Sequence, residues 1–288
     1  AELLAAARAV TREVAGLRDL PVLQPVDFQV SDRATIQEYA RLSLDREMGP
    51  EEWRAYDRLL THVGLIPPDV DLQALVLELY TEQIAGYYDP ARKAFYLADW
   101  LPQLLQRAVV AHEVTHALQD QHFELERWLA ELSPPEDATM ARAAVAEGDA
   151  MAAMLAFMLV PTGMAMEDLP GIRDLLQGEA GRVASAYPTF DQAPKALQRL
   201  LTFPYVEGTD FVMYTHRAGG WDAVDRLYAD PPASTEQILH PERYHGQRDD
   251  PRAVEPPAGP AGATPVIRGS WGEFGVGLML DAALGDSA

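Results

Sequence analysis

The run HEVTH, residues 112–116, places two histidines four positions apart, with a glutamate directly after the first. On a helix this spacing brings both imidazoles to one face, one turn apart, where both can reach one Zn²⁺ at roughly 2.1 Å. Glu113 then lies beside the ion, where it can take a proton from water and pass it to a leaving amine. The spacing therefore predicts zinc ligation by His112 and His116, with Glu113 as general base.

The residues around this run are apolar, as a metal helix inside a protein requires. Residues 108–111 read AVVA, and residues 117–118 read AL. Imidazoles and a carboxylate in such surroundings are costly unless something pairs with them. This cost argues against the alternative that His112 and His116 are unrelated side chains of one helix.

A catalytic zinc ion takes three protein ligands and keeps one position open for water. His122 stands ten positions after His112, which is the spacing of the third histidine in the HExxHxxGxxH sequence of metzincins. That arrangement needs a glycine that turns the chain back to the metal, and Gln119 occupies its place. If the helix continues, His122 lies about 9 Å beyond His116 along the axis, out of reach of the same ion.

Glu147 is the better candidate for the third ligand. It occurs in the run AVAEGDAM, where small and apolar neighbours make an uncompensated carboxylate costly. Gly148 allows a second helix to approach closely, and a Pro-Pro pair before this helix favours an antiparallel helical hairpin. Asp149 is expected either to orient a ligand imidazole or to lie on the helix surface, and Asp120 has a weaker claim to the orienting role.

Hydrolysis of an amide builds negative charge on the carbonyl oxygen, which a hydrogen-bond donor beside the metal would stabilise. The run PPASTEQILHPERYH holds most candidates, and we rank His240 first and Tyr244 second. Tyr205 is the third candidate, and Ser234 fits a helix N-cap. The alternative is that this run only packs a loop against the core.

Hydrophobic periodicity and helix breakers outline the elements that position these side chains. Before the metal helix, apolar residues recur at helical spacing over residues 1–19, 34–62 and 72–84. GYYDPARKAFYL then changes the period, because two aromatic runs flank the turn-like sequence DPAR. This pattern predicts a β-hairpin with strands near residues 86–88 and 94–98.

The HEVTH run lies in a stretch, residues 101–132, that has no proline or glycine after Pro102 and is expected to form one helix. A second helix is expected over residues 137–159. The C-terminal third is expected to hold shorter helices, with a mobile loop over residues 249–265 that is rich in proline, alanine and glycine.

These elements predict an α+β fold, mostly α, with a small β-hairpin or sheet beside an active-site helix. We expect a single domain over residues 1–288. Residues 1–85 would form a helical N-terminal region, and residues 86–160 the hairpin with the zinc-site helices. Residues 161–288 would form a helical C-terminal region.

HExxH on one helix with a glutamate on the next resembles the gluzincin group of zincin metallopeptidases, to which thermolysin belongs. HEVTHALQDQHF, AEGDAM and STEQILHPERY together resemble a largely uncharacterised bacterial group of zinc metallopeptidases, across residues 112–244. The resemblance implies a zincin-like fold, ligation of zinc by His112, His116 and Glu147, and Glu113 as general base. Thermolysin-like enzymes carry an aspartate four residues after the ligand glutamate, and Met151 stands there in this chain.

In zincins an edge strand near the metal helix binds the substrate peptide by strand addition. Residues 94–97 are placed in the sequence for that task, and an ordinary hairpin is the alternative. The function that follows is a zinc-dependent peptidase, acting as an endopeptidase on peptides or proteins. The alternatives are a catalytically silent zinc-binding regulator and a zinc hydrolase of a non-peptide amide; the intact Glu113 argues against the silent protein.

The composition limits the other possibilities. Apolar residues make up 48% and charged residues 23% of the chain, as in soluble globular proteins, and the net charge of −21 disfavours nucleic acid as a partner. No cysteine is present, which excludes thiolate ligands and disulfides. The most apolar run, residues 151–160, is about half the length needed to cross a bilayer, so we expect no integral membrane span. The chain starts at Ala1 without a methionine, so we expect an extracytoplasmic or secreted location over a cytoplasmic one.

Overall fold

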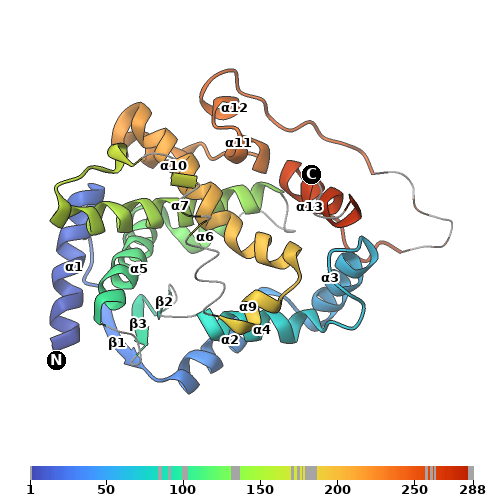
Figure 1. The fold of residues 1–288 in the computed structure, drawn as a ribbon, viewed down its shortest axis with the longest axis horizontal. Helices are drawn as coiled ribbons and strands as arrows, with labels where there is room; N and C mark the ends of the chain where they lie inside the picture. The colour runs from blue at the N-terminus through green and yellow to red at the C-terminus, as the bar shows by residue number, and fades with distance from the viewer. Residues whose placement is uncertain are drawn as a thin grey trace.

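Helices make up most of the chain, and one small sheet lies beside them (Figure 1). The computed structural model describes residues 2–83, 86–89, 92–98, 103–130, 137–169, 172, 173, 176, 178, 187–256, 259, 262 and 264–284. Within these residues the α+β, mostly α, fold class expected from the sequence is confirmed.

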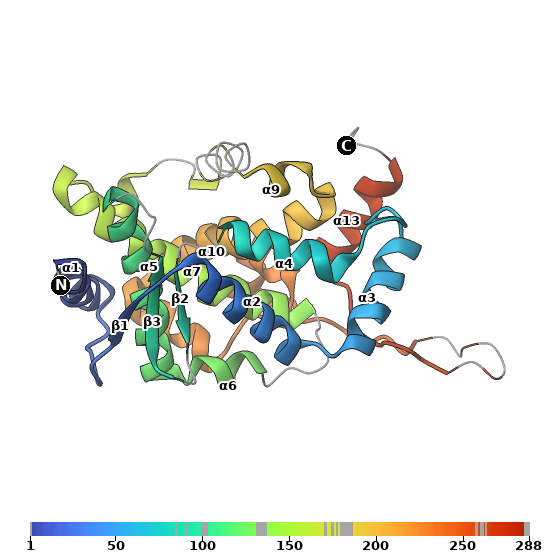
Figure 2. The ribbon, with the colours of Figure 1, turned by 90° about the horizontal axis from the view of Figure 1, so that it is seen from below.

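The sheet has three strands, which Figure 2 shows side by side next to α5 (Gln103–Phe123). Strands β2 (Gly86–Asp89) and β3 (Ala94–Ala98) pair antiparallel, which confirms the predicted hairpin. Strand β1 (Asp27–Ser31) pairs parallel with β3 and was not expected. Because β3 is the middle strand, the prediction that residues 94–97 form a free edge for substrate is wrong.

Four helices precede the hairpin in sequence. They are α1 (Glu2–Arg18), α2 (Arg33–Glu47), α3 (Pro50–His62) and α4 (Leu72–Gln83). The single helix expected over residues 34–62 is divided at Gly49-Pro50, because proline has no amide hydrogen to donate and fits the first turn of a new helix.

The HEVTH run lies on α5 (Gln103–Phe123), and a short helix α6 (Leu125–Ala130) follows it. The two were expected to be one helix. Glu124 separates them with a left-handed backbone, φ 52°. Helix α7 (Asp137–Leu159) has the predicted bounds, whereas the Pro-Pro connection between α6 and α7 lies outside the described residues.

The C-terminal third holds one long helix, α10 (Lys195–Ala229), in addition to the short ones expected there. It is kinked at Gly219 and Gly220, which have non-helical backbone angles. The other elements are η1 (Val160–Thr162), η2 (Met166–Asp168), α9 (Pro188–Gln192), α11 (Thr235–Leu239), α12 (Glu242–His245) and α13 (Glu273–Leu284). The described residues within 249–265 form no helix or strand.

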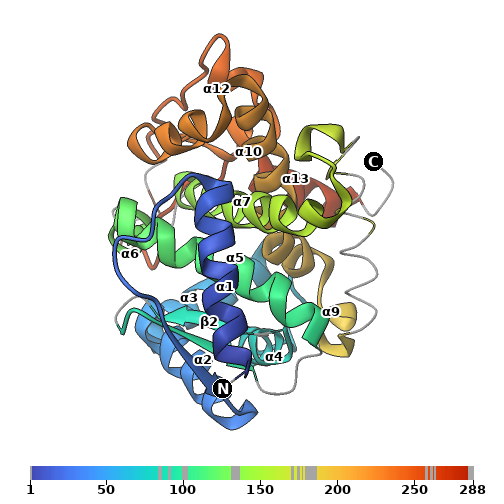
Figure 3. The same cartoon turned by 90° about the vertical axis from the view of Figure 1, so that its left-hand side faces the viewer.

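Helix α7 packs against both α5 and α10, and α1 packs across α5 (Figure 3). Alanines form much of the buried surface of α7, and its closest backbone contact is with α10. A Cβ at Gly148 would overlap the carbonyl of Gly208, and a Cβ at Gly208 would overlap the carbonyl of Ala144. Only glycine at these two positions allows the backbones to touch, and this contact places Glu147 next to α5.

The segment Asp137–Thr162 is long and apolar enough to cross a membrane by length and composition alone. Half of its most apolar window is buried inside the protein. It carries Glu147 and Asp149 and contacts helices on two sides, as expected of a core helix. This fits the expectation that the chain has no integral membrane span.

We predict that Gly148→Ala destabilises the protein, because the added methyl group has no space between α7 and α10. Overpacking of this kind lowers the free energy of unfolding by about 1–3 kcal/mol, or more where backbone must move. The control is Gly16→Ala in α1, where no atom lies within 4 Å of the added Cβ. Urea unfolding should show the control at least as stable as the wild type; equal stability of the two variants would contradict the packing argument.

Candidate metal centre

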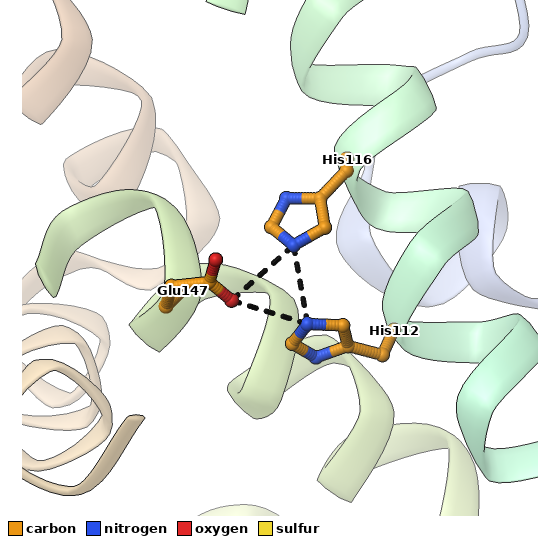
Figure 4. Close-up of side chains that lie close together, drawn as sticks. All are labelled: His112, His116 and Glu147. Atoms are coloured by element: carbon orange, nitrogen blue, oxygen red, sulfur yellow. Dashed lines mark hydrogen bonds and ion pairs between the residues drawn. The ribbon is translucent and has the colours of Figure 1, made fainter. Parts of the chain in front are cut away.

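Three side chains from two helices point at one another (Figure 4). The Nε2 atoms of His112 and His116, both on α5, are 3.1 Å apart. Glu147 Oε2, from α7, lies 3.2 Å from His112 Nε2 and 3.3 Å from His116 Nε2. The structure thus brings together the three side chains that the sequence suggested as ligands.

This triangle has the dimensions of a zinc site. Tetrahedral zinc with bonds of roughly 2.1 Å separates its ligand atoms by about 3.4 Å, close to the three distances seen here. Two imidazole nitrogens and a carboxylate oxygen are also a common catalytic zinc donor set. With their acceptor atoms facing one centre, the three groups repel unless a proton or a cation lies between them. The residues present therefore fit a zinc ion.

The charges within the cluster favour a proton on His116. Burial lowers the pKa of His116, but the adjacent Glu147 carboxylate outweighs it and raises the pKa to about 9. Burial in turn raises the pKa of Glu147, and the charge of His116 with hydrogen bonds from both imidazoles lowers it far below the usual range. The imidazolium–carboxylate pair occupies the place where a cation fits.

Glu113 lies on α5 beside the cluster and is held by the sheet. Its Oε2 accepts a hydrogen bond from the backbone N–H of Tyr88 in β2, at 3.1 Å. Burial raises the pKa of this carboxyl above its ordinary value, against the opposing charges of the two histidines. A raised pKa suits a group that must take up and release a proton near neutral pH.

Gln119 was not expected to contribute to the site. The N–H of His116 Nδ1 donates to Gln119 Oε1 at 2.8 Å, and Gln119 Nε2 donates to Asp149 Oδ2 at 3.0 Å. Of the two roles expected for Asp149, a position on the helix surface is wrong, because the residue is fully buried; it connects to the imidazole of His116 through Gln119. The spacing of three residues between His116 and Gln119, which places both on one helix face, was the signal that could have identified it.

Tyr205, on α10, completes the surroundings of the ligands. Its ring stacks on that of His112, with centroids 6.1 Å apart, and its hydroxyl lies near the carboxylate of Glu147. The charge of Glu147, followed by burial, raises the pKa of Tyr205 well above its ordinary value, so the hydroxyl keeps its proton. The side chain nevertheless remains 40% exposed, so solvent reaches this side of the site.

The structure does not bring His240 and Tyr244 to the cluster. His240 Nε2 pairs with Glu273 at 2.9 Å, and the Tyr244 hydroxyl donates to the backbone of Asp230. Both residues follow α11, whose first residue, Thr235, donates hydrogen bonds from its backbone N–H and its hydroxyl to Asp137. This contact fixes α11 beside the first residue of α7. Asp137 precedes Glu147 by ten residues on α7, which is about 15 Å along the axis. His240 and Tyr244 therefore lie near the start of α7, away from Glu147.

Two other polar residues of α5 have partners away from the ligands. His122 Nε2 lies 2.8 Å from the carbonyl oxygen of Pro21. Because α5 continues to Phe123, His122 stays away from the cluster, as expected. Asp120 accepts from the Tyr88 hydroxyl at 3.0 Å, so it holds β2 and not an imidazole.

No family model matches the chain, and no curated protein matches it. A solved structure from Chloroflexus aurantiacus, described as a "putative hydrolase with a novel fold", is similar over 86% of this chain and 89% of that chain. The two chains are 20% identical, and the TM-score is 0.49. A likeness this distant carries no argument about function.

Zinc affinity should rise with pH, because an ion must displace the proton that His116 holds below about pH 9. Metal binding at pH 7 should release about one proton per ion, and the apparent affinity should increase roughly tenfold per pH unit. Competition with a chromophoric chelator between pH 6.5 and 8.5 measures this slope. An affinity that does not change over that range would contradict the ion-paired cluster.

Proposed function

We propose that this chain is a zinc-dependent hydrolase that cleaves peptide bonds. The observation that carries the proposal is the triangle of His112, His116 and Glu147 with the carboxylate of Glu113 next to it. A structural zinc site is closed by four protein ligands and needs no neighbouring base. Three ligands and an adjacent base favour catalysis, and the resemblance to gluzincins supports the same class.

Bound by these three side chains, zinc would supply a Lewis acid that activates water and polarises a carbonyl group at neutral pH. The proton of the water then passes to Glu113. Because the Tyr88 N–H holds Oε2 of this carboxylate, we assign the proton transfer to Oε1. The water oxygen adds to the carbonyl carbon, and the same Glu113 oxygen gives the proton to the leaving amine as the C–N bond breaks.

Tyr205 is the donor that we propose for the developing oxyanion. It is the one of the three expected candidates that lies against the proposed ligands, because its ring stacks on His112 and the charge of Glu147 acts on its hydroxyl. A phenol that keeps its proton can turn to an oxygen that gains charge in the transition state. His240 and Tyr244 are bound elsewhere and are not part of this proposal.

Strand β2 is the edge that we propose for the substrate. Its Tyr88 N–H points at Glu113 and away from β3, so the outer edge of β2 faces the site. Gly86 lies two residues earlier and presents its backbone on the same edge. Repeated amide groups of an extended peptide would pair with such an edge, which favours a peptide over a small amide.

Glu113→Gln should abolish peptide cleavage and leave zinc binding intact, because it removes the base but no ligand. General-base removal typically costs about 10²–10⁴-fold in kcat. Casein and peptide libraries, with and without a zinc chelator, provide the assay, and Glu126→Gln in α6 is the exposed control. Cleavage that survives both the chelator and the substitution would sink the proposal. A zinc-loaded wild type that cleaves nothing would favour the regulatory alternative.

Tyr205→Phe should lower kcat by about 10²–10³-fold while KM changes little, because an oxyanion donor acts mainly in the transition state. Tyr214→Phe is the matched control, since Tyr214 lies on the same helix with similar exposure, 41% against 40%. Steady-state kinetics on a cleaved peptide separate the two constants. A Tyr205→Phe variant with the kcat of the wild type would remove this residue from the mechanism.

A further inference from the structure

The side-chain amide of Gln119 can lie in only one orientation. Its Nε2 is 3.0 Å from the carbonyl oxygen of Ala146 and 3.0 Å from Asp149 Oδ2. Both partners are acceptors at neutral pH, so the NH₂ group must face them. The amide oxygen then faces His116, 2.8 Å from Nδ1. The Nδ1 atom of His116 must therefore carry a proton, so the neutral imidazole presents the lone pair of Nε2 to a metal.

Asp149 is in turn fixed by the last residue of the first helix. Arg18 donates from Nε to Asp149 Oδ1 at 2.5 Å and from Nη2 to Oδ2 at 3.1 Å. The Tyr228 hydroxyl donates to Oδ2 at 2.8 Å. Arg18, Asp149 and Gln119 are each 0% exposed, so water does not compete for these hydrogen bonds.

Arg18 is itself held from two directions. Its Nη2 also donates to Asp225 at 2.7 Å, and its guanidinium lies over the ring of Trp221, 4.6 Å from the centroid. Both partners belong to α10. The guanidinium thus joins α1 to α7 and α10 at one buried point, and a chain of three contacts leads from it to His116.

We propose that Arg18 is a positioning residue of the metal centre, which it reaches through Asp149 and Gln119, so that the docking of α1 sets the affinity for the metal. Without the guanidinium, Asp149 would lose two of its four hydrogen bonds and would no longer be held toward Gln119. The amide of Gln119 could then turn, and His116 would present a proton in place of a lone pair to the ion. This inference rests on the zinc site proposed above.

The test measures zinc affinity in four full-length variants and the wild type. Gln119→Leu removes the contact to His116 but leaves Asp149 paired with Arg18 and Tyr228. Arg18→Met removes the guanidinium, and Arg18→Lys keeps the charge but cannot form the two-pronged contact. Arg12→Met is the control, because Arg12 is an exposed arginine of the same helix.

Loss of such outer contacts typically weakens metal binding by roughly 10–100-fold. We expect this loss in Gln119→Leu and Arg18→Met, a smaller loss in Arg18→Lys, and none in Arg12→Met. NMR of the zinc-loaded wild type should also show a slowly exchanging proton on His116 Nδ1, and that signal should disappear in Gln119→Leu. A general loss of stability would not by itself remove the signal of the His116 Nδ1 proton.

If Arg18→Met does not fold, Arg18→Lys carries the test of the first helix. Zinc affinities of Gln119→Leu and of the folded Arg18 variant within twofold of the wild type would overturn the inference, while zinc binding by the wild type would leave the proposed function standing. A wild type that binds no zinc would overturn the proposed function as well.

Discussion

The structure depends on one electrostatic constraint, which is a carboxylate placed between two imidazoles in the interior of a helical protein. Glu147 cannot remain there uncompensated, since a buried charge without a partner costs several kcal/mol. In the metal-free protein the partner is protonated His116, and a zinc ion fits the same place. The surrounding helices bring the side chains of His112, His116 and Glu147 together, and we infer that this cluster binds a cation.

Contacts between neighbouring elements position the side chains of the cluster. Helix α10 touches α7 at Gly148 and Gly208, and α7 thereby holds Glu147 against α5. The sheet contributes through β2, whose Tyr88 contacts both Glu113 and Asp120 on the metal helix. Glu147 and Glu113 are thus each positioned by an element other than their own, whereas His116 contacts Gln119 on its own helix.

Local patterns in the sequence were enough for the hairpin, for α7 and for the three proposed ligands. Two histidines four apart share a helix face, and a glutamate in an alanine-rich run needs a partner, so both signals are contained in short segments. Zinc itself and the likeness to gluzincins stay predictions. The break at Glu124 could not be foreseen, because no glycine or proline marks its left-handed backbone.

Contacts between distant segments account for the remaining differences. Strand β1 pairs with β3 across more than sixty residues, supported by the edge contact of Phe28 with Phe95. Tyr205 reaches the ligands because α10 crosses α7, and the role of Gln119 becomes visible only with Asp149 and Arg18 in place. Periodicity carries no information about such pairs, which is why His240 and Tyr244 ranked above Tyr205.

The most direct measurement is anomalous diffraction at the zinc edge from crystals of the zinc-loaded protein. The account predicts one strong peak roughly 2.1 Å from His112 Nε2, His116 Nε2 and a carboxylate oxygen of Glu147. A peak bound by other side chains, or none near this triangle at stoichiometric zinc, would contradict it.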